Sequence, residues 1–519
     1  MEYGLLSLIP PFLAIVMALI TKNTILSLLA GVFIGATIIF GWNPLVAVPS
    51  MISEFFIPLV GDEWNAGMLV LVTMCGGFVY MIKISGASKA FGDAVSRKIK
   101  TRKGGQLMAY FSAFAFIYTE PTLTLGAIMR PVTERLRISR VKLAYICDVM
   151  GCPFASLSPI TSYGVYATGL IATQFVALGI SDNPWTAFLK AIPFNFYAIF
   201  GLVTLLYVII RSIDVGPMYI AEKRAIETGH LIGEKDNPMT KEEAGEFTAV
   251  ESKDVNISVY NFLIPMVGLF VTLISVILWS GDVAKNGFGG AFMNGNITLG
   301  IITGFFVSSV LAGIMGAKSK IYKYDEIVSK FVRGIMLNSE IPLILVLAWS
   351  IGKITQLMDL KGFLIAFVQN TSIAPGLIPA LIFVVGALVA FSTGSSWGVW
   401  SIMMPISIPM AQAFGMSIPL MIGAVISGGA FGDHCSPISD TTILASTAAG
   451  ADHVEHVRTQ LPYALTVGIS SLVGFLAGGL ITPILGIIAT AVCIFIGLQI
   501  LQAQSKKTYE MNSEKQIAS

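Results

Sequence analysis

The stretch Gly428–Gly450, GGAFGDHCSPISDTTILASTAAG, combines polar side chains with helix-breaking residues inside a chain that is otherwise strongly apolar. Gly432 and Pro437 interrupt any helix that runs through it. Its polar residues are acids, a histidine and hydroxyl side chains: Asp433, His434, Ser436, Ser439, Asp440, Thr441 and Thr442. A bilayer tolerates broken backbone and charge at depth only where protein or a water-filled cavity supplies partners. The stretch therefore predicts a site for an ion or a substrate within the membrane.

The composition around this stretch is that of a membrane protein with many spans. Of the 519 residues, 55% are hydrophobic and only 12% are charged, and the mean hydropathy is +0.79. The net charge of +2 gives no indication of nucleic-acid binding. The cysteines lie in apolar segments and predict buried thiols rather than a disulfide framework. No Walker-type glycine-rich loop is present, which argues against an ATP-driven pump.

Apolar segments of about 20 residues, the length that a membrane span needs, recur along the chain. We expect an all-α polytopic membrane protein with roughly eleven to thirteen crossings, some of them broken or re-entrant. A charged stretch in the middle is expected to be a solvated cytoplasmic linker, with a regulatory segment as the alternative. The predicted parts are a first transmembrane repeat at 1–210, the linker at 211–257, a second repeat with terminal spans at 258–501, and a cytoplasmic tail at 502–519.

Basic loops set the predicted orientation, because Lys and Arg concentrate on the cytoplasmic side. The loops around 83–103, 135–142 and 318–333 are basic, so the first span begins outside. The segment between the first two of these loops leaves and returns on the same side. We therefore expect a hairpin around Glu120-Pro121.

A short internal repeat relates the two halves. Leu157–Ser162, LSPITS, resembles Cys435–Asp440, CSPISD, at an offset of 278 residues (436 − 158). The basic loops give the second half the opposite orientation to the first. Inverted-topology repeats with paired helix breaks are typical of secondary transporters, whose site lies near the midplane between the repeats.

Asp440 is the first candidate to bind a cation. A carboxylate in the membrane needs a cation, a proton or hydrogen-bond donors as partners. The hydroxyl groups of Ser436, Ser439 and Thr441 supply the oxygen ligands that hard cations prefer. Na⁺ and H⁺ compete for such a carboxylate, which is the simplest physical basis of exchange. Asp440 also fits a cap at the start of a half-helix, and the two roles are compatible.

The residues near Asp440 each have two possible roles. Asp433 contributes to the same cation site or ends a span at an aqueous vestibule. His434 senses pH, since imidazole titrates near neutrality, or is a hydrogen-bonded structural residue. His453 and His456 are expected on a solvated cytoplasmic turn, where they lack the further ligands that a metal site needs.

Two acids lie in apolar runs of the first half. Glu120, with Thr119 beside it, precedes a proline and is expected to lie on the ion pathway or to pair with Arg130. Asp148 is likewise expected on the pathway, or paired with a base such as Lys142. Both positions are hypotheses of function because intramembrane acids are costly.

Two hydroxyl-rich stretches are further candidates for the pathway of the ion or solute. They are Ser158, Thr161 and Ser162 in the first half, and Thr393, Ser395 and Ser396 in the second. A half-helix that begins at such a stretch can hold a carboxylate at its positive N-terminal end. The alternative for the second stretch is close packing of helices through small residues.

Four segments together resemble the NhaC-type Na⁺/H⁺ antiporter family of the ion transporter superfamily. They are the motif at 432–442, DHVEHVRTQLPYAL at 452–465, STGSSWGVWSIMMPI at 392–406 and MRPVTERLRISRVKLAYICD at 129–148. The resemblance implies a multi-pass exchanger of the bacterial inner membrane, and it carries over these motif positions: Asp433, Ser436, Ser439, Asp440 and Thr441. The family also contains Na⁺-coupled exchangers of small organic acids, such as malate–lactate antiporters, and relatives associated with amino acids.

The chain departs from the family pattern in the first half. Relatives often carry Asp-Asp-Tyr where this chain has Tyr118-Thr119-Glu120-Pro121, and Asp-Ser-Thr where it has Asp148-Val149-Met150. A changed site of this kind implies a different stoichiometry or an organic substrate.

The sequence therefore predicts a secondary transporter. Repeats with carboxylates at their breaks argue against a channel, and no nucleophile–base pair or zinc-binding helix motif supports an enzyme. The first hypothesis is exchange of cytoplasmic Na⁺ for external H⁺. The alternative is Na⁺- or H⁺-coupled transport of a small organic acid or amino acid, which needs a pocket where a bare ion needs only a few oxygens. Beyond Na⁺, H⁺, such a solute and the lipid bilayer, no cofactor or nucleic-acid partner is expected, and a homodimer is compatible with this prediction.

Overall fold

The computed structural model describes residues 3–21, 23–85, 99–117, 121–234, 236–238, 258–337, 339–360, 362–363, 374–437 and 439–517. Across these ranges the backbone is almost entirely helical, and a single isolated bridge joins Pro238 to Asp452. Ten helical segments in the described part are long and apolar enough to cross a membrane, and Gly4–Met17 and Ile25–Ile39 are shorter apolar helices. The predicted all-α polytopic fold is confirmed.

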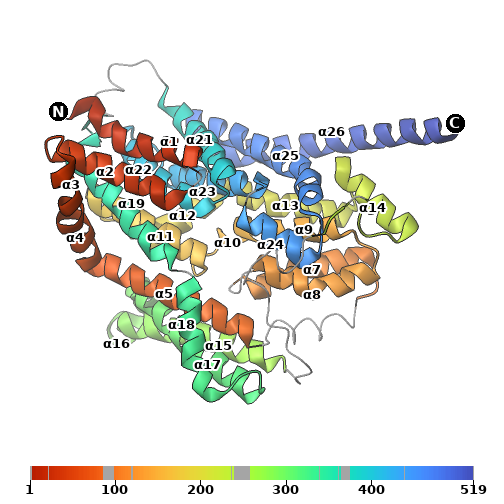
Figure 1. Ribbon diagram of the computed structural model, residues 1–519, viewed down its shortest axis with the longest axis horizontal. Coiled ribbons are helices and arrows are strands. Elements are labelled where there is room, and N and C mark those ends of the chain that lie inside the picture. The colour runs from red at the N-terminus through yellow and green to blue at the C-terminus, as the bar shows by residue number, and fades with distance from the viewer. Residues whose placement is uncertain are drawn as a thin grey trace.

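Along the chain the helices form two sets, one before and one after residues 239–257, and the colours of Figure 1 follow this order. The first set is η1 (Gly4–Leu8), α1 (Ile9–Thr21), α2 (Thr24–Ile39), α3 (Pro44–Ser50), η2 (Met51–Phe56), α4 (Ile57–Gly61), α5 (Glu63–Ile84), α7 (Arg102–Phe116), α8 (Pro121–Arg135), α9 (Arg140–Val149), α10 (Cys152–Ala155), α11 (Ser162–Leu178), α12 (Pro184–Ala191), η3 (Ile192–Phe194), α13 (Phe196–Arg211) and α14 (Gly216–Thr228). The second set is α15 (Tyr260–Ser280), α16 (Val283–Asn294), α17 (Ile297–Lys318), η5 (Tyr324–Glu326), α18 (Ile327–Leu337), α19 (Glu340–Leu357), η6 (Pro375–Leu377), α21 (Ile378–Thr393), α22 (Ser396–Ala413), α23 (Ile418–Cys435), α24 (Asp440–Ala449), α25 (His453–Leu480) and α26 (Pro483–Ile517).

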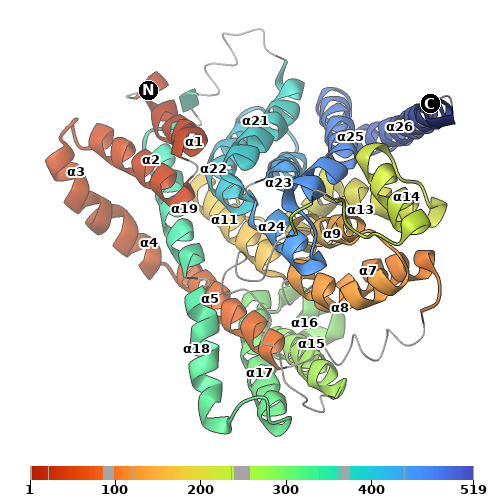
Figure 2. The ribbon, with the colours of Figure 1, turned by 45° about the vertical axis from the view of Figure 1, so that its right-hand side comes forward.

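The first helices of each half pack against a helix of the other half. The helices α1 and α2 pack together and α2 lies on α19, whereas α15 and α17 pack together and α17 lies on α5. Figure 2 shows these two pairs in separate places, red near the N-terminus and green at the bottom of the view. The α2–α19 approach is close: a Cβ added at Gly35 would lie 2.5 Å from Cγ2 of Ile354. The two halves are therefore interlocked rather than stacked.

The repeated sequence stretches also repeat in local structure. Helix α11 begins at Ser162 and α24 begins at Asp440, again 278 residues apart. The residue before each helix caps it: the Thr161 hydroxyl accepts from Gly164 N at 3.2 Å, and the Ser439 hydroxyl accepts from Thr442 N at 3.5 Å. Such caps satisfy backbone N–H groups that a helix start leaves without partners.

The turns that precede these caps match as well. Ser158 N donates to Ala155 O at 3.3 Å, and Ser436 N donates to Asp433 O at 3.0 Å, at the same offset. The resemblance between the two sequence stretches is thus a resemblance of two helix breaks. The opposite orientation of the two halves in the membrane stays a prediction.

Each half also contains a helical hairpin next to its break. Helices α7 and α8 pack against each other, as do α21 and α22. The hairpin predicted around Glu120-Pro121 would join α7 to α8, but its tip, 118–120, lies outside the described residues. The α21–α22 tip turns at Gly394, which has a φ of 66° and ends α21.

The described part of the charged stretch, up to Pro238, is packed against the helices. Glu222 of α14 is buried, accepts a hydrogen bond from Ser139 N at 2.7 Å and forms an ion pair with Arg102. Asn237 N donates to the Asp452 carboxylate at 2.9 Å. This segment therefore joins α7 and α9 of the first half to the start of α25, whereas 239–257 lies outside the described residues.

Helix α23, which ends at the second break, packs on α21 through glycines spaced by four residues. A Cβ added at Gly432 would lie 2.1 Å from Ala387 O and 2.6 Å from the Ala390 Cβ, and one at Gly428 would lie 2.6 Å from Phe383 O. Spaced small residues let membrane helices approach backbone to backbone. The position of the break therefore depends on this contact.

We expect Gly432→Ala to destabilise the protein by about 1–3 kcal/mol, because the added methyl group forces α21 and α23 apart. Thermal unfolding of the purified protein in detergent measures the effect as a lower midpoint temperature. Gly201→Ala on α13 is the matched control, since nothing lies within 4 Å of its added Cβ. Equal midpoints for the two variants would contradict the close packing of α21 on α23.

Candidate functional site

The break between α23 and α24 gathers buried oxygen atoms. Ser439 Oγ donates to Asp433 Oδ1 at 2.7 Å and lies 3.0 Å from Thr441 Oγ1. These three side chains are 1%, 0% and 3% exposed in the order Asp433, Ser439 and Thr441. We call them the Asp433 group. They bring together three of the five motif residues that the sequence predicts for a cation site.

The two other motif residues have different positions. Ser436 is buried and donates to Phe391 O at 2.7 Å, so it ties the break to the last turn of α21. Asp440 is the first residue of α24, and its side chain lies outside the described part of the structure. The cap of α24 is Ser439 and not Asp440, because the Ser439 hydroxyl accepts from the backbone N–H three residues on.

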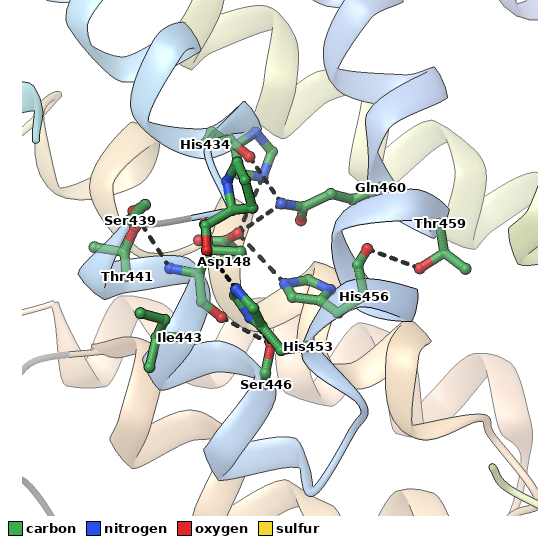
Figure 3. Close-up of polar contacts among 12 residues, drawn as sticks. Asp148, His434, Ser439, Thr441, Ile443, Ser446, His453, His456, Thr459 and Gln460 are labelled. Atoms are coloured by element: carbon green, nitrogen blue, oxygen red, sulfur yellow. Dashed lines mark hydrogen bonds and ion pairs between the residues drawn. The ribbon is translucent and has the colours of Figure 1, made fainter. Parts of the chain in front are cut away.

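A second buried polar group surrounds Asp148 at the end of α9 (Figure 3). Gln460 Nε2 donates to Asp148 Oδ2 at 2.9 Å. His456 Nε2 and His434 Nε2 lie 3.4 Å and 3.9 Å from the same oxygen. We call these four residues the Asp148 cluster. It joins α9 of the first half to α23 and α25 of the second.

The prediction that Asp148 pairs with Lys142 is wrong. Lys142 Nζ forms an ion pair with Asp214, which follows α13. Residues six apart on a helix are separated by roughly 120° around its axis, so the two side chains of α9 point to different neighbours. Asp148 is fully buried, and among the described residues its ion-pair partners are the two imidazoles.

Several atoms of the Asp148 cluster are buried without a hydrogen-bond partner among the described residues. They are Asp148 Oδ1, His434 Nε2, His456 Nδ1 and Nε2, and Gln460 Oε1. Burying a polar atom without a partner costs free energy, and such atoms concentrate where water, an ion or a proton is handled. The imidazole ring of His434 is hydrogen-bonded through its Nδ1 to the Tyr197 hydroxyl at 2.6 Å.

The sequence analysis missed His456 and Gln460. The expectation that His456 lies on a solvated turn is wrong, because its side chain is 0% exposed. His453 is only half-buried, and its ring nitrogens contact Ser446 Oγ at 3.0 Å and Pro437 O at 2.6 Å. One sequence pattern could have indicated these two residues. Positions 456 and 460 are four apart, so their side chains share one face of α25.

In the first half, the hydroxyl stretch lies beside a pocket. Thr161 is buried and donates to Ala155 O at 2.7 Å, while Ser158 and Ser162 are half-buried. A pocket of about 50 Å³ is lined here by residues that include members of α5, α11, α17, α19 and α22. The lining includes hydroxyl, aromatic and aliphatic side chains: Thr161, Ser162, Tyr163, Phe305, Ile341 and Trp397.

The hydroxyl residues of the α21–α22 tip serve the ends of the two helices. Thr393 Oγ1 donates to Val389 O at 2.9 Å, and Ser395 caps α22 by accepting from Gly398 N at 3.4 Å. Ser396 is buried and accepts from the Cys152 thiol at 3.3 Å. Of these three predicted pathway residues, Ser396 therefore connects the two halves.

The remaining predicted pathway residues, Thr119 and Glu120, lie outside the described residues. Arg130, the alternative partner of Glu120, forms an ion pair with Glu134 at 2.9 Å. Over the described part of the chain, no group of three or more His, Cys, Asp and Glu side chains is arranged to hold a metal ion. An ion at the second break would therefore depend on hydroxyl and backbone oxygens beside the acids.

Comparisons with known proteins agree with these features. A sequence model of the Na⁺/H⁺ antiporter family matches residues 154–480, which include the second break. An uncharacterised protein of Haemophilus influenzae is 32% identical over 504 residues, and the match covers 94% of each chain. A malate-2H⁺/Na⁺-lactate antiporter of Bacillus subtilis is 27% identical over 248 residues, which are 44% of this chain and 46% of its own.

The fold has a counterpart among solved structures. The YdaH transporter of Alcanivorax borkumensis superposes with a TM-score of 0.54, over 84% of this chain and 88% of its own. The two sequences are only 14% identical, so this likeness concerns the fold alone.

Ser439 has two roles in this geometry, as the cap of α24 and as a donor to Asp433. We expect Ser439→Ala to lower the free energy of unfolding by about 2–3 kcal/mol, since it loses a cap and a hydrogen bond to a buried carboxylate. Ser417→Ala, which removes only the cap of α23 at Leu420 N, should cost about 1 kcal/mol. Thermal unfolding in detergent compares the two variants, and equal losses would show that the Ser439–Asp433 bond adds nothing to stability.

Proposed function

The chain belongs to the Na⁺/H⁺ antiporter family, and on that basis we propose that this secondary antiporter exchanges cytoplasmic Na⁺ for external H⁺ across the bacterial inner membrane. The Bacillus subtilis relative with a named activity is an antiporter. The observation that carries the proposal is the Asp433 group, a carboxylate and two hydroxyls buried at a helix break. Asp440, the first residue of α24, adds a second acid at the same break.

The chemistry of the Asp433 group suits a small hard cation. Carboxylate and hydroxyl oxygens are the ligands that such ions prefer, and the end of α23 contributes the negative end of a helix. A buried carboxylate costs several kcal/mol unless a cation, a proton or donors accompany it. The site is therefore occupied by a positive charge for most of a transport cycle, which is the condition for exchanging one cation against another.

An inward proton gradient drives the proposed exchange. When the buried acids face outside, the protein takes up a proton, and when they face the cytoplasm, it binds Na⁺ and releases the proton. In either state the bound cation offsets the negative charge of the buried acids, so that the protein can change between the two states. This cycle needs two states of the protein, which inverted repeats supply by exchanging their conformations.

We expect Asp433→Asn to reduce Na⁺-driven proton movement roughly a hundredfold, because losing a charged partner of a buried ion costs about 3 kcal/mol. Asp440→Asn is expected to act in the same way. The measurement uses proteoliposomes with a trapped pH dye, to which Na⁺ is added. Asp325→Asn, at an exposed acid of η5, is the control. Full activity of Asp433→Asn would overturn the assignment of the Asp433 group.

A second candidate function is exchange that includes a small organic acid. The lining of the pocket beside the first break is the observation that favours it, since an organic solute needs apolar walls as well as oxygen atoms. Aromatic and aliphatic walls suit a carbon skeleton, and the N-terminus of α11 beside Ser162 suits a carboxylate. A Bacillus subtilis relative is a malate-2H⁺/Na⁺-lactate antiporter, which supports the same candidate.

Filling the pocket distinguishes the two candidates. We expect Ile341→Trp to abolish any proton movement that depends on added malate, lactate or amino acids, and to leave movement on Na⁺ alone within about twofold. The same proteoliposomes and dye make the measurement, with pools of these solutes added after Na⁺. Ile314→Trp, at a residue of α17 that is 41% exposed, is the control. Proton movement on Na⁺ alone and no response to any solute would remove the second candidate.

A further inference from the structure

The Asp148 cluster is separate in its chemistry from the Asp433 group. The Asp433 group consists of a carboxylate and hydroxyls, whereas the Asp148 cluster combines a carboxylate with two imidazoles and an amide. Asp148, His456 and Gln460 are each 0% exposed, and His434 is 3% exposed. The carboxylate and the imidazoles of the cluster can bind a proton, and among the described residues no group of three or more His, Cys, Asp and Glu side chains is arranged to hold a metal ion.

The net charge of the Asp148 cluster depends on how many protons it binds. With the Asp148 carboxylate ionised and both imidazoles neutral, the cluster carries one negative charge. One additional proton, on an imidazole or on the carboxylate, makes it neutral. Burying an uncompensated ion in a low dielectric is costly, so the buried cluster favours the state with one additional proton.

The groups around the cluster do not supply the missing positive charge. Lys142 belongs to α9 as well, but it is paired with Asp214. Three arginines lie on the surrounding helices, and none of them is directed at the cluster. Arg140 of α9 pairs with Glu134 at 3.0 Å, Arg458 of α25 pairs with Glu455 at 3.3 Å, and Arg211 is exposed at the end of α13. His453 of α25 contacts Ser446 and Pro437. The remaining titratable residues on these helices are Tyr145, Cys147, Tyr197, Tyr207, Asp433, Cys435, Glu455 and Tyr463, which supply no positive charge to replace a proton at Asp148.

We propose that Asp148 and His456 hold the proton that is exchanged, and that Na⁺ binds at the separate Asp433 group. This assignment rests on the proposed Na⁺/H⁺ exchange. Gln460 positions the pair, because its Nε2 donates both to Asp148 Oδ2 at 2.9 Å and to His434 O at 2.8 Å. His456 Nε2, 3.4 Å from the carboxylate, is the nearest base that can share the proton.

The geometry also couples the two sites. His434, whose carbonyl accepts from Gln460, directly follows Asp433 at the end of α23. A Na⁺ ion at the Asp433 group and a proton on the Asp148 cluster are like charges inside the protein, so they repel each other. By linkage, each therefore lowers the affinity of the protein for the other, which is the thermodynamic requirement of antiport.

The test measures binding of radioactive Na⁺ to the purified full-length protein over a range of pH. If one proton leaves per ion bound, Na⁺ affinity rises about tenfold for each unit by which pH increases. We expect Asp148→Asn to remove this slope, because the cluster is then neutral without a proton. Asp325→Asn is the matched control and keeps the slope. A folded Asp148→Asn protein with the wild-type slope overturns the proposal.

His456→Gln tests the second half of the proposal. Loss of the nearest base weakens proton binding, so the range over which Na⁺ affinity depends on pH moves to lower pH. His230→Gln is the control, since His230 is an exposed residue after α14. An unchanged range for His456→Gln overturns the role of His456 and leaves Asp148 as the sole carrier.

A readout without Na⁺ separates failure of this proposal from failure of the proposed function. The protein has four histidines, so solid-state ¹⁵N NMR of histidine-labelled protein gives a simple spectrum in which His456→Gln identifies one signal. We expect the His456 signal to differ between wild type and Asp148→Asn, because the carboxylate favours a proton on the neighbouring imidazole. If wild type binds no Na⁺ but this difference is present, Na⁺ exchange is overturned and the proton site stands. If the His456 signal is the same in both proteins, the sharing of the proton between Asp148 and His456 is overturned.

Discussion

The structure depends on one constraint, that acids buried at broken helices must find partners on other segments of the chain. Asp433 is satisfied across the break by Ser439, a residue that also caps the next helix. Asp148 ends α9 in the first half and is satisfied by side chains of α25. The close α21–α23 packing through Gly428 and Gly432 then fixes where the break lies. Helix packing, capping and buried charge are therefore parts of one arrangement around α23.

The two polar groups differ in the type of positive charge that their atoms suit. Hydroxyl and carboxylate oxygens are the ligands that hard cations such as Na⁺ prefer, whereas an imidazole nitrogen binds a proton near neutrality and is a poor ligand for such cations. Adjacent residues of α23, Asp433 and His434, belong one to each group. If the proposed functions hold, the end of α23 contributes to both the Na⁺ site and the proton site. A movement of α23 therefore changes the Asp433 group and the Asp148 cluster together.

Sequence patterns were sufficient for the features that are local. The apolar segments predict the helical membrane fold, and the LSPITS and CSPISD stretches predict two breaks of the same form. The partners of Asp148 were not predictable, because His456 and Gln460 lie more than 300 residues further along the chain. Near the start of α25 they stand among charged residues and look solvated. Only the packing of α9 against α25, a tertiary contact, buries them.

The interlocked packing of the halves has a consequence for how the protein is made. Gly35 of α2 meets Ile354 of α19, a residue that is synthesised about 320 positions later. At ~5–20 residues per second, α2 waits in the membrane for tens of seconds before its partner exists. During that interval its glycine face is covered by lipid or by the insertion machinery. Helix α5 waits in the same way for α17, so the first half cannot complete its packing until α19, which ends at Leu357, has entered the membrane.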